Sequence, residues 1–323
     1  MSFTTEVKNE ICTLNLTKLE DIALLSGFLR STDIELKEDI NIIVENPKIV
    51  RKLYITFKQI YDINILITLS KGNNFNKKNY YKLTIKDKID YILKDLMVYD
   101  NEYLTKPLPY FLEDEDLKRA YLRGSFLSSG SVNDPKKSRY HLEFLVNKKE
   151  EAEFIIELLN YFNINAKLLR RDKGYMTYVK EAEKIGDFLR IISANNAVLY
   201  YEDIRIYRDH KNMTNRLNNM EQANIDKMIA SSNNKLNDIQ IIKEKIGLDL
   251  VDEKLKEVII YREKYKEVSL QELTNIINYE TNNNLTKSGR NHRIRSIVLI
   301  KYFLLEILQN TISNLLSSSL ISL

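Results

Sequence analysis

The feature that most constrains the fold of this 323-residue chain is an internal duplication. The segment 19–36, LEDIALLSGFLRSTDIEL, aligns with 117–134, LKRAYLRGSFLSSGSVND, and this alignment places Gly27 on Gly124. Two further pairs of segments align in the same order, 40–65 with 141–166 and 80–93 with 174–189. Matched blocks at offsets near 100 residues indicate that the first two thirds of the chain contain two copies of one structural unit.

The two copies share one pattern of apolar residues. Each begins with an apolar helix that carries the glycine, and strand, amphipathic-helix, strand-pair and closing-helix patterns follow. The strands are expected at 40–44, 63–69 and 80–85, and at 141–146, 164–169 and 175–180; the amphipathic helices are expected at 47–60 and 149–161. We predict an α+β fold class in which a pseudo-symmetric αββαββα unit occurs twice.

The repeated glycine predicts how the two copies meet. A glycine inside a helix costs roughly 1 kcal/mol relative to alanine. Such a glycine lets two backbones approach more closely than any side chain would. Because it occurs at equivalent positions in both copies, we predict that the helices carrying Gly27 and Gly124 pack against each other, rather than that each glycine is tolerated without a role.

This duplicated unit resembles the LAGLIDADG homing-endonuclease fold. The motif falls on 25–33, LSGFLRSTD, and on 122–130, LRGSFLSSG. The resemblance implies an acidic metal ligand at the penultimate position of each motif, above the DNA. This chain has Thr32 and Ser129 at those positions.

Neutral hydroxyls at the two motif positions argue against nuclease chemistry, because Mg²⁺ needs hard anionic oxygens as ligands. A slipped pair, Asp33 with Asp134, is the alternative that would keep a Mg²⁺-dependent endonuclease. The chain also lacks a P-loop, a Rossmann glycine pattern and a Ser-His-Asp elbow, and its histidines are scattered. We therefore expect no catalytic residues, no cofactor and no metal site.

Basic residues gather around one predicted hairpin and in the polar helical segment after residue 202. We take five of them as candidate phosphate contacts: Arg170, Arg171, Arg208, Lys211 and Arg216. Lysine and arginine are common on any protein surface, so a solvated hairpin and a polar connector are the alternatives.

The clearest local pattern in the last third is a capping box, Ser269-x-x-Glu272, which predicts the start of a helix. After a polar turn longer than that of a minimal motif, a second helix is expected from about Ser288. Between Thr281 and Lys301 the chain has five Lys or Arg residues and no acidic residue. Two short helices with a basic start to the second predict a helix-turn-helix.

The second helix has two faces in a helical projection. Ile294, Ile297, Val298 and Leu304 share the face expected to pack on the preceding helix. Arginine can pair with guanine, and asparagine with adenine, in the major groove. The candidate DNA-binding residues are Ser269, Gln271, Lys287, Ser288, Arg290, Asn291, His292, Arg293, Arg295 and Ser296. The alternative is a surface helix whose basic residues face water.

The whole arrangement resembles the WhiA family of bacterial DNA-binding regulators. The specific marks are YLRGSFLSSGSVNDPKKSRYHLEF at 121–144 and KSGRNHRIR at 287–295; further marks are NRLNNMEQANIDK at 215–227 and MSFTTEVKNEI at 1–11, which is weak alone. The resemblance implies a sequence-specific regulator tied to cell division and chromosome segregation, and to sporulation in some relatives. Double-stranded DNA is the implied partner, with other regulatory or transcription proteins as further candidates.

The predicted domains follow from these patterns. They are two LAGLIDADG-like halves at 1–97 and 98–204, a basic linker at 205–218, an all-α helix-turn-helix domain at 219–310 and an amphipathic tail at 311–323. The apolar stripe of the tail either packs on the body or pairs with another chain. The alternative to a DNA-reading double domain is a platform that binds a protein or a ligand, with DNA contacted only by the helix-turn-helix.

The chain carries no pattern of a secreted or membrane protein. Its one cysteine, Cys12, allows no intramolecular disulfide and fits a reducing compartment. We expect no signal peptide and no membrane span, because the first residues include glutamates and no uninterrupted apolar run reaches 18 residues. We expect a cytoplasmic, nucleoid-associated protein.

Overall fold

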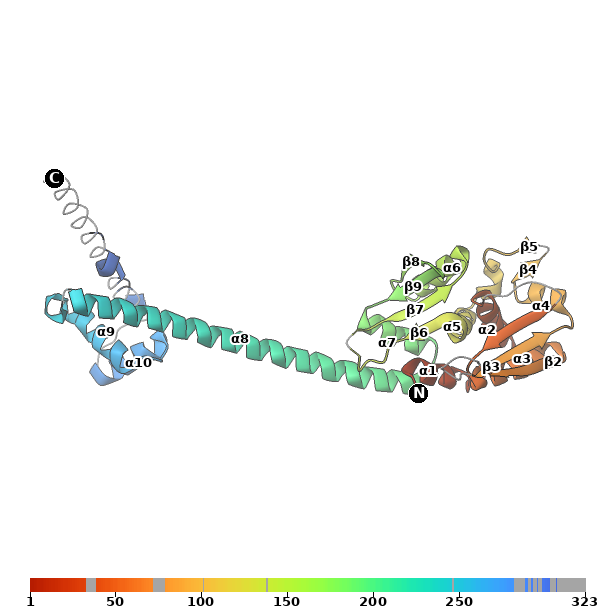
Figure 1. The fold of residues 1–323 in the computed structure, drawn as a ribbon, viewed down its shortest axis with the longest axis horizontal. Coiled ribbons are helices and arrows are strands. Elements are labelled where there is room, and N and C mark those ends of the chain that lie inside the picture. The colour runs from red at the N-terminus through yellow and green to blue at the C-terminus, as the bar shows by residue number, and fades with distance from the viewer. Residues whose placement is uncertain are drawn as a thin grey trace, which may run out of the picture. The chain divides into compact units, whose positions relative to one another are not determined.

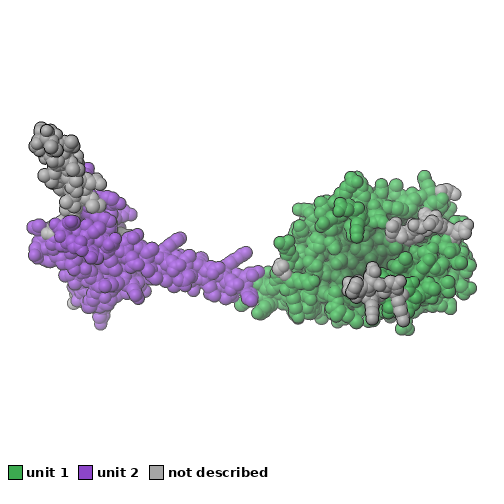
Figure 2. Space-filling view, viewed as in Figure 1, with its two compact units in different colours: residues 1–210 green, residues 211–323 purple. Residues whose placement is uncertain are grey.

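The computed structural model describes residues 1–32, 39–71, 79–100, 102–137, 139–245 and 247–281, and beyond them Ser288, Gly289, His292, Arg295, 298–302 and Glu306. The chain divides into two compact units, residues 1–210 and residues 211–323, which Figure 2 colours separately. Each unit is described by itself below, with the elements labelled in Figure 1.

The first half of unit 1 contains a three-stranded antiparallel sheet in the order β1-β3-β2. Its elements are α1 (Phe3–Ile11), α2 (Lys18–Arg30), β1 (Ile40–Val44), α3 (Pro47–Tyr61), β2 (Ile65–Lys71), β3 (Asn79–Ile85) and α4 (Ile89–Asp95). Ile40 lies opposite Ile85 on β3, which lies opposite Ile65 on β2. Residues 33–38, between α2 and β1, lie outside the described residues.

The second half shows the predicted αββαββα order in full. Its elements are α5 (Glu115–Ser129), β6 (Gly130–Val132), β7 (Leu142–Val146), α6 (Lys149–Tyr161), β8 (Lys167–Arg171), β9 (Gly174–Val179) and α7 (Ala182–Ile191). The sheet order is β6-β7-β9-β8, so β8 is an edge strand. The halves are joined by β4 (Tyr99–Asp100), β5 (Glu102–Tyr103) and the short 3₁₀ helix η1 (Pro109–Leu112).

The glycine-bearing helices α2 and α5 lie side by side at the centre of unit 1 (Figure 1), as predicted. A Cβ atom added to Gly124 would lie 1.9 Å from the carbonyl oxygen of Leu24, and one added to Gly27 would lie 2.2 Å from that of Tyr121. No Cβ tolerates such distances, so both glycines are required for this backbone contact.

The structure corrects the alignment of the two halves by one residue in the middle block. The sequence comparison set Ile40 against His141, but Ile40 and Ile42 face the core of the first half as Leu142 and Phe144 do in the second. A shift of one residue moves every side chain of a strand to the opposite face of the sheet. The equivalent residues of the two halves are therefore 102 apart in this block, as the starts of α3 and α6 also show.

A buried ion pair joins the two halves through residues that are not equivalent in the repeat. The Nε of Arg30, at the end of α2, donates to Oε2 of Glu151 on α6 at 3.0 Å, and both side chains are fully buried. The hydroxyl of Tyr121 donates to the same carboxylate at 2.8 Å. The remaining donors of Arg30 bond the carbonyls of the connecting segment: Met97 O at 2.8 Å, Leu104 O at 3.0 Å and Thr105 O at 2.8 Å. This one arginine therefore holds α2, α6 and the connection between the halves.

Unit 2 is helical throughout its described residues. Its elements are the continuation of α8 (Asn195–Lys245), which starts in unit 1, then η2 (Leu248–Leu250), α9 (Glu253–Lys264) and α10 (Leu270–Thr281). The predicted linker 205–218 lies entirely within α8. The core is formed by Ile239, Ile242, Val251, Leu255 and Ile259, with Ile300 packed against them. No helix among the described residues has the length and apolar character needed to span a bilayer.

Candidate nucleic-acid interface

The predicted capping box starts α10. The backbone N–H of Ser269 donates to Oε2 of Glu272 at 2.8 Å, and the N–H of Glu272 donates to Oγ of Ser269 at 3.2 Å. The pKa of the Glu272 carboxyl is lowered, chiefly by the bond from the backbone N–H of Ser269 and next by the Ser269 side chain. The reciprocal pair satisfies the N–H groups of Ser269 and Glu272, and Gln271 lies in the first turn with an exposed side chain.

The turn between α9 and α10 is held from two sides. Nη1 of Arg262, on α9, donates to the carbonyl oxygen of Val268 at 2.6 Å. The hydroxyl of Ser232, on α8, donates to the carbonyl oxygen of Lys266. Leu273 and Ile277 on the inner face of α10 are fully buried. The start of α10 is thus fixed relative to the helices of its own unit.

The described residues of the predicted second helix are helical and amphipathic. Ile300 packs on the core of unit 2, and Nζ of Lys301 donates to Oδ1 of Asp238 on α8 at 2.5 Å. Ser288, His292 and Arg295 have exposed side chains. Of the residues predicted to pack inward, Val298 is half-buried. This helix therefore buries one side and presents candidate base-reading residues on the other.

Several predicted sites lie outside the described residues. These are Lys287, Arg290, Asn291, Arg293 and Ser296 among the DNA-binding candidates, Ile294, Ile297 and Leu304 on the predicted packing face, and the tail 311–323.

The candidate phosphate contacts differ in their surroundings. Arg170 and Arg171 are exposed on the edge strand β8, and Lys211 and Arg216 are exposed on α8. Arg208 is tied to the loop between β6 and β7. Its Nη1 donates to the carbonyls of Pro135 at 2.6 Å and Lys137 at 2.7 Å, and its guanidinium lies 4.6 Å from the ring centroid of Tyr140. Arg208 therefore has a structural role that the charge pattern of the sequence did not indicate.

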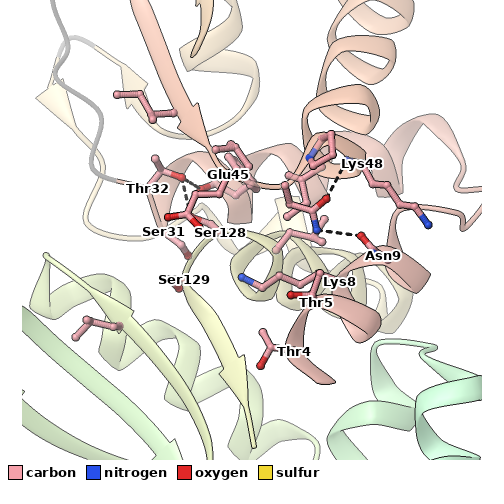
Figure 3. A pocket seen from close by; sticks show the side chains of 18 of the residues that line it. Thr4, Thr5, Lys8, Asn9, Ser31, Thr32, Glu45, Lys48, Ser128 and Ser129 are labelled. Carbon is pink, nitrogen blue, oxygen red and sulfur yellow. Dashed lines mark hydrogen bonds between the residues drawn. The ribbon is translucent and has the colours of Figure 1, made fainter. Parts of the chain in front are cut away.

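The two positions of the missing nuclease carboxylates lie at the ends of the paired central helices (Figure 3). Oγ1 of Thr32 donates to the carbonyl of Phe28 at 2.7 Å and lies 2.7 Å from Oγ of Ser128. The hydroxyl of Ser129 donates to the carbonyl of Ser125 at 3.1 Å. The hydroxyl pair across the two helices is thus Thr32 with Ser128, and Ser129 bonds within its own helix.

Of the alternative acidic pair, Asp33 with Asp134, the structure describes only Asp134. Asp134 accepts hydrogen bonds from the N–H of Lys136 at 2.9 Å and from the hydroxyl of Tyr200 on α8 at 3.3 Å, and Asp33 lies outside the described residues. Within the described part of the chain, no cluster of three or more His, Cys, Asp or Glu side chains is arranged to hold a metal ion.

A cavity of about 740 Å³ lies beside these hydroxyls. Its walls come from the ends of α2 and α5, from β1 and β7, and from the N-terminal helix α1, which contributes Lys8 (Figure 3). Sequence reasoning missed Lys8 because α1 lies outside the repeat, although the Ser2 cap and the apolar spacing of Phe3, Val7 and Ile11 are typical of a short amphipathic helix.

Three family models match the chain. They are the WhiA N-terminal LAGLIDADG-like domain over residues 20–99, the WhiA LAGLIDADG-like domain over 118–211 and the WhiA C-terminal HTH domain over 214–301. The matches thus extend over both units.

Relatives in sequence and in structure agree with these models. The chain is 40% identical over 303 residues to the probable cell division protein WhiA of Bacillus cereus (strain AH187), covering 92% of this chain and 95% of that protein, and equally similar to that of Bacillus anthracis (strain CDC 684 / NRRL 3495). The crystal structure of full-length DUF199/WhiA from Thermatoga maritima superposes with a TM-score of 0.56 at 27% identity, covering 94% of this chain and 98% of that one.

Proposed function

Because this chain belongs to the WhiA family, we propose that it is a sequence-specific DNA-binding transcriptional regulator that acts in cell division and chromosome segregation. The observation that carries the proposal is the amphipathic segment after α10. It is anchored by Ile300 and Lys301 and presents Ser288, His292 and Arg295 to solvent. The family supports this reading, since its C-terminal model is a helix-turn-helix and its relatives are named as cell division proteins.

In the proposed mechanism the helix from about Ser288 enters the major groove, and arginines such as Arg295 read bases by hydrogen bonding. The N-terminus of α10, with Ser269 and Gln271, faces a backbone phosphate, which the helix dipole favours. Lys211 and Arg216 on α8 add charge that neutralises phosphates. Base contacts then provide specificity, and phosphate contacts provide most of the salt-dependent affinity.

We further propose that the N-terminal double domain does not cleave DNA. Thr32 and Ser129 replace the carboxylates, and both hydroxyls donate to carbonyls of their own helices. A neutral hydroxyl cannot hold Mg²⁺ or stabilise charge at phosphorus as a carboxylate site does. The rival is an endonuclease that uses Asp33 with Asp134. Against it, the described half of that pair accepts bonds from Lys136 and Tyr200 and does not line the cavity at the motif ends.

The test is retention of genomic DNA fragments by the full chain, in buffer of about 0.15 M salt, followed by incubation of the retained fragments and a supercoiled plasmid with Mg²⁺. We expect a small set of fragments to be enriched and no nicking at any Mg²⁺ concentration. Retention of all fragments in proportion to their length would contradict sequence-specific binding. Mg²⁺-dependent nicking that is lost in Asp134→Asn would establish the endonuclease instead.

The remaining parts of the proposal follow from DNA binding. We propose that the protein acts in the cytoplasm on the nucleoid, with double-stranded DNA as its partner and other regulatory or transcription proteins as further ones. We also propose 1–97, 98–204 and 219–310 as the three domains, with 205–218 as a basic helical connection within α8.

A further inference from the structure

The cavity at the ends of α2 and α5 is large enough for a ligand. Its volume of about 740 Å³ falls in the range typical of small-molecule sites. Positions that correspond in the two halves line it as pairs: Ser31 with Ser128, Thr32 with Ser129, Ile43 with Leu145 and Glu45 with Asn147. The cavity therefore lies on the pseudo-dyad axis, at the place where the resemblance to the nuclease fold implies a metal ion.

Lys8 brings a positive charge to this place (Figure 3). Burial lowers the pKa of its ammonium group to about 8. Among the described residues no carboxylate or carbonyl bonds its Nζ, which lies 5.6 Å from the ring centroid of Phe126. An ammonium ion is rarely left in a half-buried position without a counterion, because desolvation disfavours its charge.

The helix that carries Lys8 is firmly held. Phe3, Val7 and Ile11 on its inner face are buried in the core of unit 1. The hydroxyl of Thr4 donates to the carbonyl of Val132 on β6 at 2.7 Å and accepts from its N–H at 3.0 Å. At the other end, the carboxylate of Glu10 accepts the N–H groups of Asn196 at 2.7 Å and Ala197 at 3.0 Å at the start of α8. Lys8 is therefore preorganised in the cavity.

The other polar groups of the cavity suit an anion that also carries hydrogen-bond donors. The amides of Asn9 and Asn147 also line the cavity, and the oxygens of Thr32 and Ser128 can accept bonds. The other charged lining groups are the terminal ammonium of Met1 and the exposed side chains of Glu45 and Lys48, which are opposite in sign. Among the described residues the charged groups of the lining therefore sum to a positive charge, and Lys8 is the one whose burial lowers its pKa.

We propose that this cavity binds a phosphate group, with the Lys8 ammonium as its counterion in the place where the nuclease fold would hold a metal. The charge is attached to the protein and cannot activate water as a metal ion does, so the site binds phosphate without cleaving it. The inference goes beyond the proposed function, because it requires no contact between the helix-turn-helix and DNA. The phosphate belongs either to a DNA backbone or to a soluble phosphorylated compound.

The test uses the full chain and four proteins: wild type, Lys8→Gln, Lys8→Arg and the control Lys18→Gln. Lys18 is exposed at the opposite end of α2, so its replacement removes the same charge away from the cavity. Inorganic phosphate is titrated by calorimetry, and a random 20-base-pair duplex is titrated separately in phosphate-free buffer. We expect wild type, Lys8→Arg and Lys18→Gln to bind alike, and Lys8→Gln to bind at least about tenfold more weakly.

The two titrations separate the sources of phosphate. A Lys8-dependent response to inorganic phosphate supports a soluble ligand, and a Lys8-dependent response to the duplex alone supports a DNA phosphate. If Lys8→Gln matches wild type in both titrations, the proposal is wrong. Should Lys8→Gln fail to fold, the pKa of Lys8 in wild type, followed by NMR of ¹³C-methylated lysines, decides. Binding predicts a rise from about 8 on addition of phosphate or duplex, and an unchanged value overturns the proposal.

Discussion

At the scale of single residues, Lys8 combines a cost in stability with a proposed function. Its pKa is about 8 in the folded chain and near 10.5 when unfolded, so folding disfavours the charged form. Below pH 8 the charged ammonium destabilises the fold, and this cost disappears as pH rises from about 8 to 10.5. Residues in binding sites commonly lower the stability of the fold, because they are retained for function and not for stability.

Lys8→Met should therefore raise the free energy of unfolding at pH 7, by about 1–3 kcal/mol, given about 1.4 kcal/mol per pKa unit. The gain should shrink between pH 8 and pH 10.5, because wild type then loses its buried charge. Urea denaturation across this pH range measures it, with Lys18→Met as the control. A variant less stable than wild type at pH 7 would show that the Lys8 ammonium is stabilised rather than penalised.

Cys12 is predicted to be unreactive in the folded chain. Burial raises the pKa of its thiol to about 11, although Lys52, Lys48 and Lys8 oppose the shift. Because the thiolate is the reacting species, modification by a thiol reagent at pH 7.5 should be at least about a hundredfold slower in the native than in the urea-unfolded chain. Equal rates in the two states would mean that the thiol is exposed and ionised.

The Arg30–Glu151 pair should show strong energetic coupling. Removing one partner leaves a buried charge, which typically costs about 3–5 kcal/mol. We expect Glu151→Leu to lose this much stability, and Arg30→Met/Glu151→Leu to lose less than the sum of the single variants. The double variant should stay less stable than wild type, because Met97, Leu104 and Thr105 lose a donor to their carbonyls. Additive losses in a double-mutant cycle would contradict the coupling.

At the scale of elements, the contact between α2 and α5 determines how the two halves join. The glycines were recognisable in the sequence because the repeat placed them at equivalent positions. Gly124→Ala should destabilise the chain by about 1–3 kcal/mol, because the new methyl group meets the backbone carbonyl of Leu24. The control is Gly186→Ala in α7, where the nearest obstacle is the side-chain carboxylate of Glu202 and not a backbone atom. Thermal unfolding that shows equal effects would argue against a required close approach.

Some elements and contacts could be predicted from the sequence, and others could not. Strand and helix positions followed from periodicity, and β1 and α6 have the predicted bounds. The alignment of β1 with β7 was wrong by one residue. It matched apolar residues with apolar residues, and such a match does not indicate which face of a strand is buried. The short helices α1 and α9 were not predicted individually. The Arg30–Glu151 pair joins residues 121 apart in sequence, and no local pattern predicts such a contact.

At the scale of the whole molecule, the two units differ in the chemistry of their proposed sites. Unit 1 has a central cavity lined by hydroxyls and by the half-buried Lys8, and unit 2 has an anchored helix with an exposed polar face. The capping box and the basic run predict the second site from sequence, and the capping box is present at the start of α10. The cavity in unit 1 was only partly predictable from sequence. Thr32 and Ser129 indicated its position, but Lys8 lies outside the repeat and was not predicted to contribute a charge.

The central claim is that the helix from about Ser288 reads the DNA sequence. Its most direct test compares two pairs of arginines. Fluorescence anisotropy measures binding of the full chain to its tightest genomic fragment and to a shuffled version of that fragment. Arg293→Ala/Arg295→Ala should reduce the ratio of the two affinities at least tenfold, since a bidentate base contact contributes about 1–3 kcal/mol of discrimination. Arg170→Ala/Arg171→Ala, an equal change of charge in unit 1, should leave the ratio unchanged. If the first pair leaves the ratio intact and the second abolishes it, DNA sequence is read by the N-terminal unit and the account is wrong.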